Sequence, residues 1–511
     1  MRYVLGIDLG TSSLKALLLD EQGQVAATAS RSYPIAVPQP GWAEQDPEHW
    51  WNACCQAIGE MLAQPGIEGQ VEAVTVGGQM HGTVLLDELG SPLRPAIIWP
   101  DQRAGGEARA AEAVLMERGL LPILGGGVAP GFMLASLLWV RTHEPELWRR
   151  VHTAVLPKDY LRYRLTGGLA TEPSDACGIP AFDLRTWEWS EEALAALDLP
   201  ANLLPPLRPS EALGGVITAE AARACALRRG IPVLLGGSDQ AMAAIGTGLL
   251  HPGTLLISIS TGGQLVTPLA APLPAPAYGA RTLAHALPRR PGREGAGYLA
   301  LSATLGAGLS LRWLREEVFA DHEEGADARL IALAAQAPPG ADGLLFLPYL
   351  AGERAPILDP VASGALVGLR LGHGRAHLAR AALEGVAYSL RHALEPLHAA
   401  GVRAERVVLA GGLGQSPLMR TIMAAVLGQP VTPLKTVEQS ALGAALLSAV
   451  HAGFFTSLEE GCGAAVHHGV PVEPAPEATE GYAAHYARYR ELYPALREEM
   501  HALREENDAR I

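Results

Sequence analysis

Apolar runs separated by short polar turns predict a meander of strands at the amino terminus. Residues 5–9 and 14–19 are largely apolar, and the residues between them are Gly10-Thr11-Ser12-Ser13. This order is typical of two antiparallel strands joined by a tight turn. A turn signal at residues 20–23 precedes a third such run at 25–33, so we expect the chain to open as an antiparallel sheet.

The same pattern returns in the second half of the chain. Residues 255–259 are apolar, the turn Ser260-Thr261-Gly262-Gly263 follows, and the chain then returns through Leu265 and Val266. Two hairpins with glycine and hydroxyl turns, one in each half, predict a duplicated domain that clamps phosphates between its copies.

Strand ends followed by glycine are the other recurring feature. Buried strands are predicted at 71–76, 233–235 and 407–410, and each runs into glycines and then polar residues. In α/β proteins such strand ends carry ligand contacts. Helices are expected at residues 48–62, 132–143, 158–165, near 219–229, and at 302–318, 377–398, 440–451 and 482–506. The chain therefore reads as an α/β protein.

The hairpin turns carry the first candidate chemistry. Gly10 allows close approach of a ligand, and the N–H groups and hydroxyls of Thr11, Ser12 and Ser13 can donate to phosphate oxygens. Asp8, at the end of the first strand, offers the hard oxygen that Mg²⁺ prefers. The alternative is an ordinary polar hairpin turn.

A second carboxylate, Asp239, follows the strand at 233–235. Phosphoryl transfer to an alcohol needs one acid beside the metal and phosphates and another that accepts the hydroxyl proton. Asp8 fits the first task and Asp239 the second, although Asp239 could equally be a helix N-cap. His81 follows another glycine-rich strand end, and its alternative is a satisfied core histidine.

The sequence alone does not decide the roles of two further segments. Residues 171–176 form a polar loop that either faces a ligand or is a surface turn. Gly306 and Gly308, early in the expected helix at 302–318, permit close approach of a flat ligand such as a nucleobase.

Composition narrows the class of protein. The 511 residues suggest two domains, and a formal net charge of -14 argues against nucleic acid as the main partner. The sequence has no charged leader at its start and no run of 18 apolar residues, so we expect a soluble cytoplasmic protein.

The five cysteines lack ligand spacing and are interpreted as packed or idle thiols, with a redox or zinc role as the lesser alternative. Lysine is scarce, which makes Lys15 beside the first turn conspicuous.

Several motifs together resemble the FGGY family of carbohydrate kinases, and within it the xylulokinases. The segments that carry the resemblance are Gly6-Ile7-Asp8-Leu9-Gly10-Thr11-Ser12, Trp42-Ala43-Glu44-Gln45-Asp46-Pro47, Gly78-Gln79-Met80-His81-Gly82, Leu156-Pro157-Lys158-Asp159-Tyr160-Leu161, Gly237-Ser238-Asp239-Gln240, and residues 364–385. They span nearly the whole chain, so the resemblance is strong.

The resemblance implies two ribonuclease-H-like domains of the actin and sugar kinase type around a central ligand cleft. Residues 1–248 would bind sugar and phosphates, 249–455 would bind ATP, and 456–511 would form a helical tail. The activity implied is ATP-dependent transfer of a phosphoryl group to the 5-hydroxyl of D-xylulose. The residues expected to contact the ketose are Met80, His81, Asp239 and Gln240, with Asp239 as the base. Those expected at ATP are Thr11, Ser12, Lys15, Thr261, Gly262, Gly308 and Gly412, with Asp8 placing Mg²⁺.

Three positions depart from the family pattern. Gln240 stands where xylulokinases usually carry asparagine and is similar to glycerol kinases, Ser260 replaces a glycine of the second phosphate loop, and Ser136 occupies a lysine position. The identity of the sugar is therefore not decided, and D-ribulose, another ketose or a glycerol-like polyol are alternative substrates. A non-catalytic actin-like ATP switch is an alternative function. The expected partner is a small molecule, with neither nucleic acid nor membrane, and a homodimer is one alternative for the oligomeric state.

Overall fold

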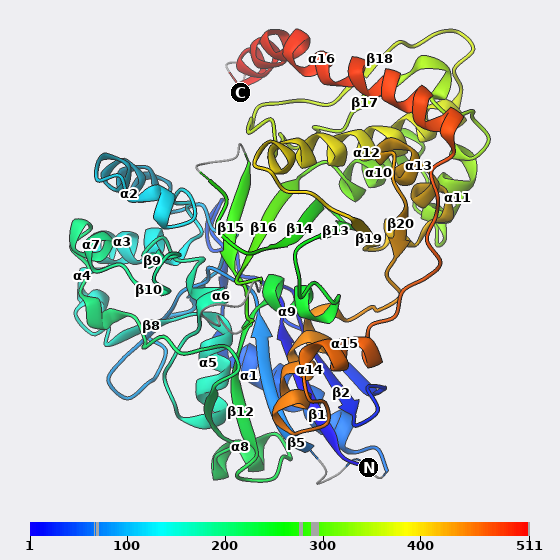
Figure 1. Ribbon diagram of the computed structural model, residues 1–511. Helices are drawn as coiled ribbons and strands as arrows, with labels where there is room; N and C mark the ends of the chain where they lie inside the picture. The colour runs from blue at the N-terminus through cyan, green and yellow to red at the C-terminus, as the bar shows by residue number, and fades with distance from the viewer. Residues whose placement is uncertain (66, 68–70, 275–278, 288–295, 509–511) are drawn as a thin grey trace.

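Two mixed β-sheets, one above the other in Figure 1, organise the molecule. The computed structural model describes residues 1–65, 67, 71–274, 279–287 and 296–508. Within that part of the chain the two largest sheets have six strands each. Helices cover both sheets, so the α/β architecture expected from the sequence is confirmed.

The first sheet has the order β11-β12-β5-β1-β2-β3. Its strands are β1 (Tyr3–Leu9), β2 (Ser13–Asp20), β3 (Val25–Ser32), β5 (Val71–Gly78), β11 (Leu213–Val216) and β12 (Pro232–Ser238). β1, β2 and β3 form the predicted antiparallel meander, and β5 runs parallel to β1 on its other side. The parallel pairing brings the carboxyl ends of β1, β5 and β12 to one edge.

The second sheet repeats this plan. Its order is β15-β16-β14-β13-β19-β20. The strands are β13 (Thr254–Ile259), β14 (Gly263–Leu269), β15 (Ala280–Ala284), β16 (Tyr298–Thr304), β19 (Arg406–Ala410) and β20 (Val431–Pro433). β13 pairs antiparallel with β14 and parallel with β19, as β1 pairs with β2 and β5. The predicted duplication is therefore present in the strand order.

The helices pack around these sheets and over one peripheral region. They are α1 (Pro47–Leu62), α2 (Gly105–Glu117), α3 (Met133–His143), α4 (Pro145–Trp148), α5 (Pro157–Thr166), α6 (Pro173–Ala176), α7 (Glu191–Ala196), α8 (Ala219–Ala224), α9 (Asp239–Gly246), α10 (Gly308–Trp313), α11 (Ala326–Ala334), α12 (Arg375–Ala399), α13 (Pro417–Leu427), α14 (Gln439–His451), α15 (Leu458–Ala465) and α16 (Pro476–Asp508). The shorter strands are β4 (Glu44–Gln45), β6 (Val84–Leu86), β7 (Ala96–Ile97), β8 (Thr153–Val155), β9 (Phe182–Asp183), β10 (Glu188–Trp189), β17 (Leu345–Leu347) and β18 (Ala365–Val367).

Apolar side chains form a core for each sheet, a core between the sheets, and a separate cluster under the peripheral helices α2, α3 and α7. The peripheral helices lie beside the first sheet in Figure 1. α16 carries Tyr482, Tyr486 and Tyr489 into the core of the second sheet, as a structural tail would. None of the described helices combines the length and the apolar composition that a bilayer-spanning helix requires. All five cysteines are free thiols.

Each six-stranded sheet and the helices that pack on it form one lobe, and two helices connect the two lobes. α9 follows β12 of the first sheet, whereas α14 follows β20 of the second sheet and returns to pack on α9, β1 and β5. They meet at Gly246 and Gly443, where a Cβ on Gly443 would lie 1.9 Å from the Met242 carbonyl oxygen. Glycine at this crossing lets the two helix backbones touch.

Gly443→Ala is therefore expected to destabilise the protein by about 1–3 kcal/mol, because an added methyl group must displace backbone rather than a side chain. Urea unfolding measures the change. The matched control is Gly463→Ala in α15, where an added Cβ meets nothing within 4 Å, and this variant should keep or slightly raise the stability. Equal stability of the two variants would contradict the close crossing.

One predicted helix is wrong in its first part. Residues 302–304 belong to β16, because Ser302 pairs with Leu265 of β14, and the helix begins only at Gly308. The helix expected near 219–229 is also shorter, since α8 ends at Ala224. Pairing with a neighbouring strand overrides local helical preference at 302–304.

Candidate active site at the strand ends

Hydrogen bonds from side chains of the first lobe hold the first hairpin turn in place. The Trp99 indole N–H donates to Thr11 Oγ1 at 2.8 Å, and Gln45 Nε2 donates to the Thr11 carbonyl oxygen at 2.7 Å. The Tyr33 hydroxyl donates to the Gly10 carbonyl oxygen. Ser12 is exposed at the tip. Three side chains thus hold the turn, while Ser12 at its tip stays exposed.

The second turn is tied to the start of α10. The N–H groups of Gly308 and Leu309 donate to the carbonyl oxygens of Ser260 and Thr261, both at 2.9 Å. A Cβ on Gly308 would lie 2.3 Å from the Ser260 carbonyl oxygen, so only glycine fits there. Ser260 and Thr261 are exposed and Gly262 is partly exposed. The structure therefore brings the predicted Thr261, Gly262 and Gly308 together in one loop cluster.

Glu353 supports this cluster and was not singled out from the sequence. Its carboxylate accepts the N–H groups of Leu305 and Arg354, each at 2.7 Å. Burial raises the pKa of Glu353 to about 7, against the effect of these hydrogen bonds. Gly412, the remaining predicted ATP residue, is exposed just after β19 and the left-handed Gly411. A carboxylate that fixes a loop through backbone N–H groups gives no local sequence signal.

Asp8 lies at the carboxyl end of β1, opposite Lys15 of β2. Its Oδ1 atom is buried and has no hydrogen-bond partner among the described residues. Burial raises the pKa of Asp8 to about 6, although the Ser440 hydroxyl and the Lys15 ammonium lower it. Lys15 itself forms an ion pair with Glu438, with 2.8 Å between Nζ and Oε2. An unpartnered, buried carboxylate oxygen is suited to a cation or its water.

Asp239 is the first residue of α9 and lies at the end of β12. The N-cap of this helix is Ser238, whose Oγ accepts the N–H of Ala241, so the N-cap alternative for Asp239 is wrong. Asp239 Oδ1 accepts the N–H of Gln240 at 2.7 Å. Burial, and then the nearby charge of Asp8, raise the pKa of Asp239 to about 7. A carboxylate with this pKa can take up a proton near neutral pH.

His81 lies just beyond β5, next to the buried Met80. Its φ is 71°, its Nδ1 lies 3.0 Å from the Gly178 carbonyl oxygen, and its ring stacks on Phe132 with centroids 3.9 Å apart. Burial lowers the pKa of His81 to about 3, so the imidazole is neutral. The hydrogen bond at Nδ1 leaves Nε2 for another partner.

The polar loop at 171–176 is neither a surface turn nor open to solvent, because its side chains are buried. Glu172 caps α6 by accepting the N–H groups of Ser174 and Asp175, and Ser174 Oγ accepts the N–H of Ser238 at 3.0 Å. Gly178, which holds His81, ends this turn. The segment therefore links the residues beside Asp239 to His81.

A buried lysine stabilises that segment. Lys158 Nζ lies 2.8 Å from Asp159 Oδ1, 3.3 Å from Glu172 Oε1 and 3.7 Å from Asp175 Oδ2, and all four side chains are essentially inaccessible. Burial lowers the pKa of Lys158, but the three carboxylates outweigh it and raise the pKa above its usual range. Lys158 thus stays charged inside the fold.

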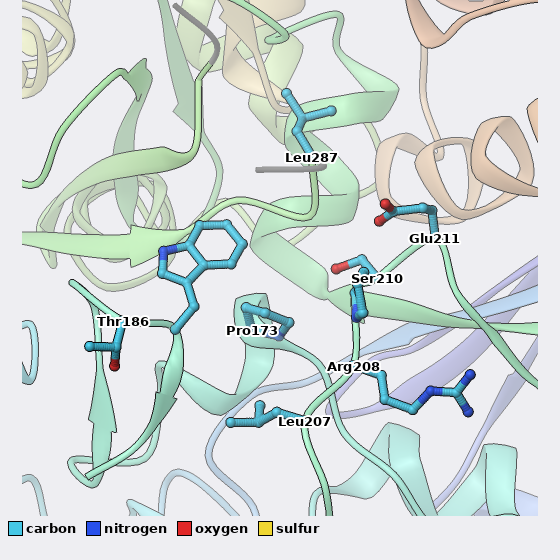
Figure 2. Close-up of a pocket in the computed structure, with 9 residues that line it drawn as sticks. Pro173, Thr186, Leu207, Arg208, Ser210, Glu211 and Leu287 are labelled. Carbon is cyan, nitrogen blue, oxygen red and sulfur yellow. The ribbon is translucent and has the colours of Figure 1, made fainter. Parts of the chain in front are cut away.

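A cavity of about 260 Å³ lies at the amino-terminal end of α6, where Figure 2 shows Pro173 and Leu207 at its wall. Its described lining includes Arg208, Ser210 and Glu211 but none of the predicted site residues. It is separate from the strand ends that carry Asp8, His81 and Asp239.

Comparison with known proteins identifies the family of this chain. Residues 3–246 match the N-terminal domain, and residues 258–452 the C-terminal domain, of the FGGY family of carbohydrate kinases. The chain belongs to this family. Within it, the chain is 36% identical to the xylulose kinase of Escherichia coli K12 over 96% of this chain and 99% of that protein. It is 32% identical to a glycerol kinase of Citrifermentans bemidjiense, over 89% of this chain and 91% of that protein.

The fold of this FGGY kinase has close counterparts among solved structures. The crystal structure of xylulose kinase from Rhodospirillum rubrum superposes with a TM-score of 0.90, at 32% identity, over 98% of this chain and all of that chain. The predicted architecture of two actin-like, ribonuclease-H-type domains is thereby confirmed.

The family implies ATP with Mg²⁺, and the described residues fit both. The two hydroxyl turns present backbone and side-chain donors, and Asp8 offers an unpartnered carboxylate oxygen. The described residues contain no group of three or more histidine, cysteine, aspartate or glutamate side chains placed to hold a metal alone. Mg²⁺ would therefore draw its remaining ligands from phosphate oxygens and water. Ser136, at the family's lysine position, is a fully buried residue of α3.

Proposed function

We propose that this FGGY kinase transfers the γ-phosphoryl group of ATP to the 5-hydroxyl of D-xylulose. The observation that carries the proposal is Asp239, a carboxylate with a pKa of about 7 at a strand end beside Asp8 and near the turn that holds His81. Identity of 36% to a xylulose kinase over almost the full chain supports the substrate.

In this proposal Asp239 accepts the proton of the attacking hydroxyl, and Met80, His81 and Gln240 orient the ketose. ATP is held by Thr11, Ser12, Lys15, Thr261, Gly262, Gly308 and Gly412. Mg²⁺ would be held by Asp8 and, when bound, would supply charge stabilisation at the phosphates. Residues 1–248 then serve sugar and phosphate binding, residues 249–455 serve ATP binding, and residues 456–511 are a tail.

The decisive experiment is a coupled ADP-release screen with Mg²⁺ and ATP over D-xylulose, D-ribulose, L-ribulose, L-xylulose, glycerol and common polyols. We expect D-xylulose to give the highest kcat/KM. Preference for glycerol would favour the second candidate, which rests on Gln240 and on the 32% identity to a glycerol kinase. Absence of any sugar-dependent ADP release would refute both and leave an ATP-dependent binding protein.

The rate should depend on pH through Asp239. A base must be ionised to accept a proton, and burial and Asp8 raise the pKa of Asp239 to about 7. We therefore expect kcat/KM for the sugar to fall about tenfold for each pH unit below 7 and to level off above it. The measurement is a pH profile at saturating Mg²⁺ and ATP. A rate that is constant down to pH 5 would contradict the role of Asp239.

A further inference from the structure

The backbone at His81 needs support from its surroundings. A φ of 71° is sparsely populated for a residue with a side chain and persists only where packing holds it. Two contacts fix the imidazole: the Gly178 carbonyl oxygen at Nδ1 and the parallel ring of Phe132 at 3.9 Å, tilted by 10°. Both partners come from the first lobe.

The second lobe reaches the same group through β15. The guanidinium carbon of Arg281 lies 4.9 Å from the centroid of the Phe132 ring. The His81 imidazole stacks on the same ring. Phe132 thus contacts a side chain from each lobe.

The same strand also touches the other support of His81. The N–H of Ala284 lies 3.2 Å from Cys177 Sγ, and Cys177 precedes Gly178, whose carbonyl oxygen holds His81. Beside it, the Tyr298 hydroxyl of β16 donates to the Leu184 carbonyl oxygen at 2.6 Å. The β15–β16 hairpin therefore docks on both first-lobe segments that position His81.

The interaction that the structure shows for the Arg281 side chain is its contact with the Phe132 ring. This side chain forms no hydrogen bond or ion pair with the described residues. Burial and then the charge of Arg354 lower the pKa of Arg281, and the charge of Glu112 raises it. Guanidinium over an aromatic face is attracted by the ring, the more so where water is partly excluded.

We propose that Arg281 is a positioning residue for sugar binding: from the second lobe it holds Phe132, and through Phe132 the imidazole of His81. This inference rests on the proposed contact between His81 and the ketose. Its consequence is that the sugar site of the first lobe is complete only when β15 is docked against it.

The test compares Arg281→Met and Arg281→Lys with the wild type in steady-state kinetics. Methionine keeps the length without charge or planarity, and we expect KM for D-xylulose to rise about tenfold, while KM for ATP stays within about twofold. Lysine should rescue part of the loss because an ammonium also binds an aromatic face. Arg370→Met, at an exposed position of the same lobe, is the matched control and should behave as wild type.

A double-mutant cycle with Phe132→Leu identifies the route. If Arg281 acts through the ring, the KM of the double variant should equal that of Phe132→Leu alone. Additive effects, or an equal rise of KM for ATP, would overturn the inference. Should His81→Ala leave KM for D-xylulose unchanged, the proposed sugar contact fails. Should His81→Ala raise KM while Arg281→Met does not, only the role of Arg281 fails. Thermal melting checks that each variant is folded.

Discussion

The Asp239→Asn variant is expected to lose sugar phosphorylation by roughly 10²–10⁴-fold while it still binds ATP. Asparagine keeps the shape and can still accept the N–H of Gln240, which Asp239 Oδ1 accepts at 2.7 Å. What it loses is the ability to take up the hydroxyl proton. Single-turnover rates and nucleotide titration measure the two properties separately. Asp327→Asn, on the exposed side of α11, is the control and should keep full activity.

The same variant should be more stable than the wild type at alkaline pH. Burial raises the pKa of Asp239 to about 7, so the ionised form weakens the folded state by up to about 4 kcal/mol at pH 8. A carboxyl group with a raised pKa costs nothing below its unfolded pKa, and the cost grows as pH rises towards 7. The increase in folding stability caused by Asp239→Asn should therefore be largest at pH 8 and disappear near pH 4. Urea unfolding without ligands measures this difference. A variant that lost activity and stability together at pH 8 would indicate a structural role instead.

Lys158→Met is expected to destabilise the protein by about 3–5 kcal/mol at pH 7, the second large effect. The lysine is completely inaccessible and lies among Asp159, Glu172 and Asp175, so its removal leaves Arg162, 3.9 Å from Asp159 Oδ1, as the remaining cation that is ion-paired with these buried carboxylates. Thermal or urea unfolding measures the loss. Lys435→Met, at an exposed position, is the matched control and should change stability little.

The loss of folding stability caused by Lys158→Met should become smaller as the pH falls. Burial raises the pKa of Asp175 well above its usual range and the Lys158 ammonium lowers it, so without the lysine this carboxyl group takes up a proton more readily as the pH falls. Activity should fall with stability, because the cluster holds the turn between Ser238 and His81. A loss below about 1 kcal/mol at pH 7 would contradict an uncompensated buried charge.

Local patterns were sufficient for the hairpins and strand ends. The turns at Gly10 and Ser260, and the carboxylates Asp8 and Asp239, are signalled by a few consecutive residues, and the structure places them at strand ends. The helix predicted at 302–318 failed at its start because β14 pairs with residues 302–304, a contact between segments that local preference does not describe.

The sequence by itself determined the α/β class, the repeated sheet plan and the residues with the right chemistry, because each follows from periodicity or from a short motif. Only the tertiary structure decided that α14 returns to the first sheet and that the turn 172–178 is buried around Lys158. It also decided that Phe132 and Arg281, 149 positions apart, meet beside His81. These are contacts across long stretches of chain, where packing and charge compensation, rather than local preference, select the partners.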